Sequence, residues 1–371
     1  MSIKIVYIVS TLRTAGPTNQ LLNIISNLDK QVFKAVVITL SPEPEESMFR
    51  YFEDLNIQMF SLNLSRIKGL IFGEKKLKKL IQEIQPDIIH SQGIRPDQMV
   101  SEIHNIPKIA TIRNYPFDDN PAKFGNIKGG ILARAHFKTI KNGEHVIACS
   151  KSLAGKFSDL HQIQMPYIQN GVDTSKYFPL DKTKKEQLRK KLGLPLNSFI
   201  CMTSGGLIQR KNTGNLISGF IKAELADSIL ILAGDGPEIT SLNKLANNKD
   251  SIKFLKSVPN VNEYLQATDL FISASFAEGL PNSVLEAMAC GLPLILSDIQ
   301  PHKELIPPGL SYEVFFDPNN TDQLAKLIKQ FPLADQGNVS RLILDYCLAN
   351  FSAKVMSGKY QKLYKEVLHV R

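Results

Sequence analysis

The stretch Phe276-Ala-Glu-Gly-Leu-Pro-Asn-Ser-Val-Leu-Glu-Ala-Met-Ala-Cys-Gly291 joins two carboxylates to a predicted helix start in this chain of 371 residues. Pro281 suits the first helical position and Gly291 suits the residue just past the helix end. Glu278 then lies in the loop before the helix, and Glu286 lies about 7.5 Å along the axis. Because a helix N-terminus attracts phosphate and carboxylates accept hydrogen bonds from hydroxyls, this stretch predicts a site for a nucleotide diphosphate that carries a sugar.

The same stretch resembles the Glu-x7-Glu signature of retaining glycosyltransferases with the GT-B fold, which use nucleotide sugars. In that family the first Glu binds the transferred sugar, and the second binds the ribose of the nucleotide. The resemblance implies these roles for Glu278 and Glu286. It implies further donor contacts from the residues after the first Glu: Gly279, Leu280, Pro281, Asn282 and Ser283. The alternative, two solvated helix charges, is disfavoured by the surrounding Glu-Gly-Leu-Pro and Cys-Gly-Leu-Pro context.

Short apolar runs alternate with amphipathic stretches along the whole chain. The expected strands are 3–10, 34–40, 57–62, 88–91, 108–112 and 146–150, then 199–204, 228–233, 251–255, 270–273, 293–297 and 312–316. The expected helices are 18–28, 74–84 and 97–104, then 212–226, 238–247, 260–268, 281–289 and 322–330. Such alternation predicts parallel sheets with helices on both faces. The fold class is therefore α/β with two Rossmann-like domains.

The resemblance implies the GT-B arrangement, in which two Rossmann-like domains face each other across a cleft. The predicted N-terminal domain, 1–175, binds the acceptor and ends in a strand and turn at 166–173. The predicted C-terminal domain, 176–345, binds the nucleotide sugar, and a charged helix at 181–192 begins it as a link. Helical structure is expected over 335–370, with the last segment, 346–371, crossing back onto the first domain.

A second candidate phosphate site is Ser204-Gly-Gly-Leu-Ile-Gln-Arg-Lys-Asn212, between a strand and a helix. Small residues allow close approach of the backbone to a phosphate, and a Lys supplies a point charge. The family has a similar loop that ends in a Lys on the diphosphate, which implies this role for Lys211. Gly206 stands where the family usually has an Arg, so either Arg210 compensates or fewer charges hold the diphosphate. The alternative for the whole loop is an exposed basic helix start.

Three further positions are implied as donor contacts. Gly16, in Thr14-Ala-Gly-Pro-Thr18, resembles the glycine-rich loop near the donor, although the alternative is a plain strand-to-helix turn. Ser257 and Val258 match a loop that contacts the nucleobase. The glycines of Ala233-Gly-Asp-Gly-Pro237 are interpreted as structural.

Arg113, in Ala110-Thr-Ile-Arg-Asn-Tyr-Pro-Phe-Asp-Asp119, is the clearest departure from the family, because many relatives have a His there. An Arg cannot act as a base at neutral pH, but it can clamp a phosphate or carboxylate. Arg113 is therefore predicted to contact the donor diphosphate or an anionic acceptor, with a salt bridge to Asp118 or Asp119 as the alternative. His90, at the end of another strand, is either a polar group in the cleft or a structural residue.

Composition excludes several classes of protein. The hydrophobic content of 43% and charged content of 21% are ordinary for a globular protein, and no apolar run has the length of a membrane span. The four cysteines have no paired spacing, which disfavours a disulfide frame or zinc site and fits a reducing cytoplasm. The absence of Asp-x-Asp predicts a site without a metal, and no cofactor is expected.

The net charge of +9 lies mostly in the first half of the chain. Up to Asn170 there are 21 basic and 15 acidic residues, a net charge of +6. An anionic membrane surface or a diphosphate-linked acceptor would explain this excess, as would an ordinary solvated surface. The basic residues singled out are Arg66, Lys68, Lys75, Lys76, Lys78 and Lys79. Nucleic acid is not an expected partner, because no recognised motif for it occurs.

The sequence thus predicts a retaining hexosyltransferase or N-acetylhexosaminyltransferase. Its donor is expected to be a UDP-sugar, and its acceptor a saccharide or lipid-linked saccharide of a cell-surface polysaccharide. The catalytic residues are expected to be Glu278, Lys211 and Arg113, in a cytoplasmic protein that attaches peripherally to the inner face of the membrane. Two alternatives remain open: a sugar-nucleotide epimerase or hydrolase on the same scaffold, and a non-catalytic donor-binding subunit.

Overall fold

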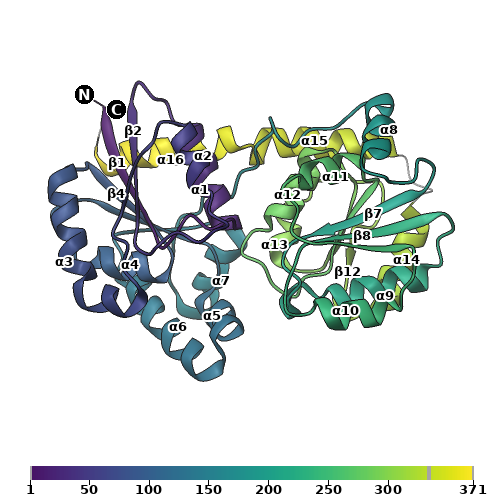
Figure 1. Cartoon of the computed structure of the whole chain (residues 1–371), viewed down its shortest axis with the longest axis horizontal. Helices are drawn as coiled ribbons and strands as arrows, with labels where there is room; N and C mark the ends of the chain where they lie inside the picture. The colour runs from purple at the N-terminus through teal and green to yellow at the C-terminus, as the bar shows by residue number, and fades with distance from the viewer. Residues whose placement is uncertain (1, 332–335, 370–371) are drawn as a thin grey trace. The chain divides into compact units, whose positions relative to one another are not determined.

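The computed structural model describes residues 2–331 and 336–369, which fold into two compact units (Figure 1). The first unit contains Met1–Gly171 and Ala353–Arg371, and the second contains Val172–Ser352. Each unit is built around one six-stranded sheet in which every paired strand is parallel. The assignment of acceptor binding to the first unit and donor binding to the second stays a prediction.

The sheet of the first unit has the strand order β3-β2-β1-β4-β5-β6. Its strands are β1 (Ile3–Val9), β2 (Phe33–Thr39), β3 (Gln58–Ser61), β4 (Ile88–Gln92), β5 (Lys108–Ile112) and β6 (His145–Ala148). Strands β1 and β2 are mostly apolar, and all residues of β4 are buried although three of them are polar, as expected when helices cover a parallel sheet on both sides. The order reverses between β1 and β4, so a ligand crevice is expected at their carboxyl ends.

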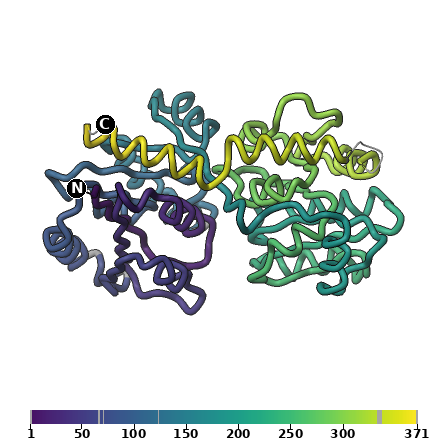
Figure 2. Tube along the Cα trace, turned by 90° about the horizontal axis from the view of Figure 1, so that it is seen from above, coloured from purple at the N-terminus to yellow at the C-terminus, as the bar shows by residue number. Residues whose placement is uncertain are grey.

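Helices cover both faces of this sheet. They are α1 (Gly16–Ser26), α2 (Phe49–Asp54), α3 (Arg66–Ile84), α4 (Ile94–Ser101), α5 (Pro116–Phe124), α6 (Asn126–Lys141), α7 (Lys151–His161) and α16 (Ala353–Val367). Apolar residues of α1 and α16 pack on one face of the sheet, and those of α3 and α4 pack on the other. Helix α16, the last in the chain, lies against α1 (Figure 2).

The sheet of the second unit has the order β12-β11-β10-β7-β8-β9. Its strands are β7 (Phe199–Ser204), β8 (Ser228–Ala233), β9 (Ile252–Leu255), β10 (Leu270–Ser273), β11 (Leu294–Ser297) and β12 (Phe315–Phe316). Its helices are α8 (Lys182–Lys191), the short 3-10 helix η1 (Gln209–Lys211), α9 (Thr213–Ala223), α10 (Ile239–Ala246), α11 (Val261–Ala267), α12 (Asn282–Ala289), α13 (Gln300–Lys303), α14 (Thr321–Gln330) and α15 (Gln336–Phe351). The order reverses between β7 and β10, and the loops after these two strands carry the predicted phosphate and sugar residues.

The expected strands and the α/β class are confirmed, but several helical predictions were wrong. Helix α3 begins at Arg66 rather than at residue 74, and the sequence did not predict α2, α5, α6, α7 or α13. The strand expected at 166–173 is reduced to isolated bridges at Tyr167 and Val172. The helical segment expected over 335–370 is two helices, α15 and α16, and its first and last residues lie outside the described residues.

Candidate functional site

The second unit gathers two cations and one carboxylate where its strand order reverses. Glu278, in the loop after β10, accepts hydrogen bonds from Arg210 Nη1 at 2.7 Å and from Lys211 Nζ at 2.6 Å. Both cations come from η1, which follows β7. Arg210 also donates to the carbonyl oxygen of Ala277, which ties the two loops together. The sequence predicted all three side chains for the donor site, and the fold brings them into direct contact.

The charge of Glu278 is fixed by these neighbours. Burial alone would raise the pKa of its carboxyl, but Lys211 and Arg210 outweigh that effect and lower the pKa to about 2. The side chain is only 6% exposed, so it is a buried anion satisfied by two cations. Ser275 donates a third hydrogen bond, at 2.8 Å, to Oε1 of the same carboxylate.

Glu286, the second carboxylate, lies within α12. The helix begins at Asn282 with Pro281 as its N-cap, one residue later than predicted, so Glu286 is about 6 Å from the helix start rather than 7.5 Å. Burial raises the pKa of Glu286 to about 7, although Lys176 and a hydrogen bond from Tyr177 act in the opposite direction. Near neutral pH, Glu286 is therefore present in both protonation states.

The loop Gly205–Leu207 before η1 packs closely on the turn after β8. A Cβ at Gly234 would lie 1.9 Å from the carbonyl oxygen of Gly205, and one at Gly236 would lie 2.3 Å from that of Leu207. The interpretation of Gly234 and Gly236 as structural residues agrees with this packing.

Lys211 and neighbouring residues line a small polar hollow of about 10 Å³, enough for roughly one water-sized group. It is lined by Thr203, Ser204, Gly205, Gly206, Leu207, Lys211, Thr213, Ala233, Ser273 and Ser275. The hollow connects the two loops that carry the charged triad of Glu278, Arg210 and Lys211.

The remaining predicted donor residues occupy loops and one helix start. Ser257 is exposed and Val258 half-buried in the loop between β9 and α11. Gly279 and Leu280 are buried just before α12, and Asn282 and Ser283 are its first two residues. Gly16 begins α1, in the first unit. A ligand contact for any of these residues stays a prediction.

Arg113, in the first unit, follows β5 and is held by two neutral side chains. Its Nε and Nη2 donate to Gln92 Oε1 at 3.1 and 3.0 Å, and its Nη1 donates to Asn170 Oδ1 at 2.6 Å. Asp118 pairs with Lys156 instead. Among the described residues no carboxylate pairs with Arg113, so the alternative of a salt bridge to Asp118 or Asp119 does not hold.

His90 lies wholly inside the first unit. Its Nδ1 bonds to the Tyr364 hydroxyl and its Nε2 to that of Thr111, both at 2.8 Å. Burial, with a smaller contribution from Arg113, lowers the pKa of His90 to about 3, so the ring is neutral. Because the side chain has no exposed surface and both nitrogens are engaged, this geometry favours the structural role over a ligand contact.

Sequence reasoning missed Ser275, Tyr177, Gln92 and Asn170, which contact the predicted residues directly. Gln92 and Ser275 could have been found from their position, because each ends or follows a strand whose carboxyl end borders the crevice. Tyr177 and Asn170 lie in irregular segments, and no periodic signal marks them.

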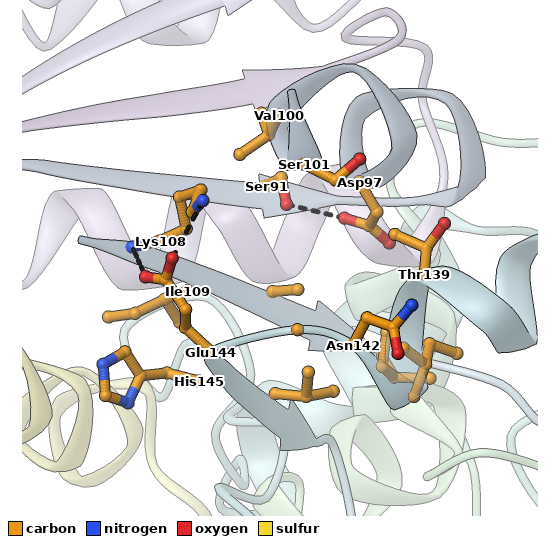
Figure 3. Close-up of a pocket in the computed structure, with 15 residues that line it drawn as sticks. Ser91, Asp97, Val100, Ser101, Lys108, Ile109, Thr139, Asn142, Glu144 and His145 are labelled. Carbon is orange, nitrogen blue, oxygen red and sulfur yellow. Dashed lines mark hydrogen bonds and ion pairs between the residues drawn. The ribbon is translucent and has the colours of Figure 1, made fainter. Parts of the chain in front are cut away.

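Another pocket lies in the first unit, between the sheet and helices α4 and α6, and has a volume of about 70 Å³ (Figure 3). Ser91 donates to Asp97, which also bonds His136, and Lys108 pairs with Glu144. No residue that the sequence singled out lines this pocket, and its volume suits a few water molecules.

Two family models match the chain, one over each half. The "Glycosyltransferase Family 4" model matches residues 14–176, and the "Glycosyl transferases group 1" model matches residues 184–341. With two parallel six-stranded sheets, the protein is a retaining glycosyltransferase of the GT-B fold. The chain belongs to glycosyltransferase family 4.

Similar proteins have been described from several bacteria. The O-antigen biosynthesis glycosyltransferase WclY of Escherichia coli is 25% identical over 98% of both chains. The putative teichuronic acid biosynthesis glycosyltransferase TuaC of Bacillus subtilis is 27% identical over 67% of this chain and 62% of its own length. The solved structure of Anabaena Alr3699/HepE in complex with UDP-glucose is 18% identical and covers 98% of this chain and 100% of its own, with a TM-score of 0.82.

Within residues 2–331 and 336–369, no cluster of three or more His, Cys, Asp or Glu side chains suits a metal ion. No helix in this part of the chain combines the length and apolar character that a membrane crossing requires. The metal independence expected from the sequence stays a prediction.

Proposed function

We propose that the protein transfers a hexosyl or N-acetylhexosaminyl group from a UDP-sugar to a saccharide or lipid-linked saccharide during the assembly of a cell-surface polysaccharide. The observation that carries this proposal is the charged triad of Glu278, Arg210 and Lys211 at the crevice of the second unit. The names of relatives in O-antigen and teichuronic acid synthesis support the acceptor class, and the UDP-glucose complex of a structural neighbour supports the donor.

The triad explains how a donor is held. Two cations that already bind a carboxylate can bind a diphosphate when Glu278 releases them, because both ligands offer anionic oxygens. Glu278 then accepts hydrogen bonds from hydroxyls of the sugar, which is the role the family implies. Before the donor binds, the two cations lower the pKa of Glu278 to about 2, so its carboxylate is already ionised and able to accept hydrogen bonds.

The same cations assist departure of the nucleoside diphosphate. Negative charge develops on the leaving phosphate as the sugar acquires oxocarbenium character, and Arg210 and Lys211 stabilise that charge. The acceptor hydroxyl then attacks from the face that the diphosphate leaves, and the departing phosphate oxygen takes its proton. This route retains the configuration of the sugar and needs no histidine at the Arg113 position.

Glu286 is proposed to hold the ribose. Its position in α12, beyond the triad along the same segment, matches the second Glu of the family signature. Tyr177 orients the carboxyl through its hydroxyl. Because ribose hydroxyls donate to an ionised carboxylate, this contact favours the deprotonated form of Glu286.

An anionic membrane surface is the proposed partner of α3. Ile67, Ile71 and Phe72 are 74%, 68% and 54% exposed on this helix. The exposed cations Lys68, Lys75, Lys76 and Lys79 share the helix; Lys79 lies 3.9 Å from Glu83, and Lys78 pairs with Glu74. Exposed apolar side chains beside cations suit an interface of acyl chains and acidic headgroups. The side chain of Arg66 lies outside the described residues.

One assay distinguishes this function from the two alternatives. The protein is incubated with a panel of nucleotide sugars, with and without lipid-linked acceptors, and products are identified by mass spectrometry. A glycosylated acceptor with retained anomeric configuration supports the proposal. Turnover of donor without acceptor would indicate an epimerase or hydrolase, and donor binding without turnover would indicate a binding subunit.

A further inference from the structure

The direction of the Arg113 guanidinium is fixed, and no carboxylate in the part of the chain that the structure describes pairs with it. Gln92 and Asn170 hold three of its nitrogens through neutral amide oxygens. This contrasts with Arg210, whose charge is paired with Glu278. An Arg presents five N–H donors, so a guanidinium anchored by three hydrogen bonds keeps capacity for an additional acceptor.

Gln92 contributes a second, independent observation. Its side chain is buried, with 7% exposure, and its Nε2 has no hydrogen-bond partner among the described residues. Because a guanidinium only donates, the amide oxygen of Gln92 must face Arg113, and this fixes Nε2 as the other atom of the same amide group. A buried N–H without an acceptor is costly, and native proteins rarely retain one without a reason.

Both residues lie where an α/β sheet binds ligands. Gln92 is the last residue of β4, and Arg113 follows β5, its parallel neighbour in the sheet. Their side chains therefore meet at the carboxyl edge of the sheet, beside the point between β1 and β4 where the strand order reverses. The half-buried position of Arg113 leaves part of it accessible to solvent.

We propose that Arg113 and the free amide donor of Gln92 together bind an oxyanion, a phosphate or carboxylate, that belongs to one of the substrates. The guanidinium supplies charge and directed donors, Gln92 Nε2 supplies one further N–H, and Asn170 positions the guanidinium. The proposal rests on the proposed function for the identity of the substrates. Two sources share this chemistry: the diphosphate of the donor, and an anionic group on the acceptor.

The substitution Gln92→Glu separates oxyanion binding from a structural role. A carboxylate at this position still accepts from Arg113, so the anchoring is kept or strengthened. The same carboxylate neutralises the guanidinium and replaces the N–H donor by an acceptor. If the pair binds an oxyanion, Gln92→Glu and Arg113→Ala both weaken binding about tenfold to a hundredfold, while only Arg113→Ala lowers the Tm. Gln31→Glu, the same change at an exposed position, is the matched control.

Binding is read from the Arg Nε–Hε signals in NMR spectra of the full chain, with the Arg113 signal assigned by its loss in Arg113→Lys. The probes are UDP, uridine, inorganic pyrophosphate and geranyl diphosphate. A shift of the Arg113 signal with UDP but not with uridine indicates the donor as the source. A shift with geranyl diphosphate in the presence of saturating UDP indicates an anionic acceptor. In either case the anion concentration that gives half of the shift should rise about tenfold to a hundredfold in Gln92→Glu.

The proposal is overturned if none of these anions shifts the Arg113 signal at millimolar concentration, or if Gln92→Glu leaves the shifts unchanged. This result is independent of the transfer assay. If the wild-type protein binds these anions at Arg113 but transfers no sugar, only the proposed function is contradicted. If it transfers sugar but binds no anion at Arg113, only the present proposal is contradicted.

Discussion

Cationic side chains border the carboxyl edges of both sheets, and they differ in the groups that form their hydrogen bonds. In the second unit, Arg210 and Lys211 are both paired with the buried carboxylate of Glu278. In the first unit, Arg113 is held by the neutral amides of Gln92 and Asn170. An anionic ligand must displace the carboxylate before it can bind a cation that is paired with one. A cation held by neutral amides can bind an anionic ligand directly.

Lys211→Ala should have the largest effect, because it removes a cation from the leaving diphosphate. We expect kcat to fall on the order of 10²–10³-fold, as for the loss of one oxyanion donor, with a smaller change in donor affinity. Steady-state kinetics measure this, with Lys244→Ala, an exposed lysine of the same unit, as the control. Near-wild-type kcat in folded Lys211→Ala would show that the pairing with Glu278 is purely structural.

If α3 binds an anionic membrane surface, removing its exposed lysines should lower the affinity for acidic vesicles by nearly as large a factor. Replacing Lys75, Lys76 and Lys79 by Gln removes about 3 kcal/mol of attraction to an anionic surface, roughly a hundredfold in affinity. Cosedimentation with vesicles of acidic phospholipid at low salt measures it. The matched control replaces Lys182, Lys184 and Lys190, exposed lysines of α8 in the second unit. Equal loss in both triple variants would indicate general charge attraction rather than docking through α3.

Glu286→Ala should weaken UDP binding by about tenfold to a hundredfold, because a hydrogen bond to a charged group contributes roughly 1.5–3 kcal/mol. Calorimetric titration with UDP measures the change, and titration with pyrophosphate is the control, since it lacks ribose. Unchanged UDP affinity in the folded variant would remove Glu286 from the site.

Uridine affinity should depend on pH through Glu286. Because burial raises the pKa of this carboxyl to about 7 and the ribose needs the carboxylate, affinity should increase as the pH rises through about 7. The raised pKa of Glu286 makes the stability of the folded protein depend on pH in the opposite direction to uridine affinity. This contribution to stability is fully present below the ordinary pKa of 4.5, and it is lost as the pH rises through about 7. Titrations with uridine across this range should show a pH dependence that Glu286→Gln abolishes. If that variant keeps the pH dependence, a group other than Glu286 causes it.

Chelation should have the smallest effect. If Arg210 and Lys211 neutralise the diphosphate, transfer should continue in excess chelator, because the charge that a metal would supply is already provided by side chains. The measurement is the transfer rate before and after dialysis against chelator. Loss of activity that manganese or magnesium restores would show that the paired cations are insufficient.

The sequence by itself specified the fold class, and it predicted the residues of the candidate donor site, whose contact with a donor stays a prediction. Apolar runs of the second sheet and the Glu278–Glu286 spacing are local patterns, which can be read without knowing what packs against them. The same holds for the loop before α9 that carries Arg210 and Lys211. Each of these features is specified by residues that lie close together along the chain.

Which side chains contact one another depends on how distant segments of the chain pack together. Gln92, Arg113 and Asn170 are distant in sequence, and their contact gives the guanidinium neutral amide partners rather than a carboxylate among the described residues. In the sequence, His90 is a polar residue near the end of a strand, which is compatible with a place in the cleft. In the structure it is buried and bonds to Tyr364 of the last helix and to Thr111. Neither relation follows from a local pattern.

The missed helices α5 and α6 have the same explanation. Pro121 interrupts α5 and Gly129 weakens α6, so local propensity disfavours both helices. A Cβ at Gly129 would lie 2.5 Å from the carbonyl oxygen of Asn120, which shows that the two helices pack backbone to backbone. Local sequence therefore specified the elements with strong periodicity, whereas the weaker elements and the partners of each charged side chain depend on contacts between distant residues, which form only when the chain is folded.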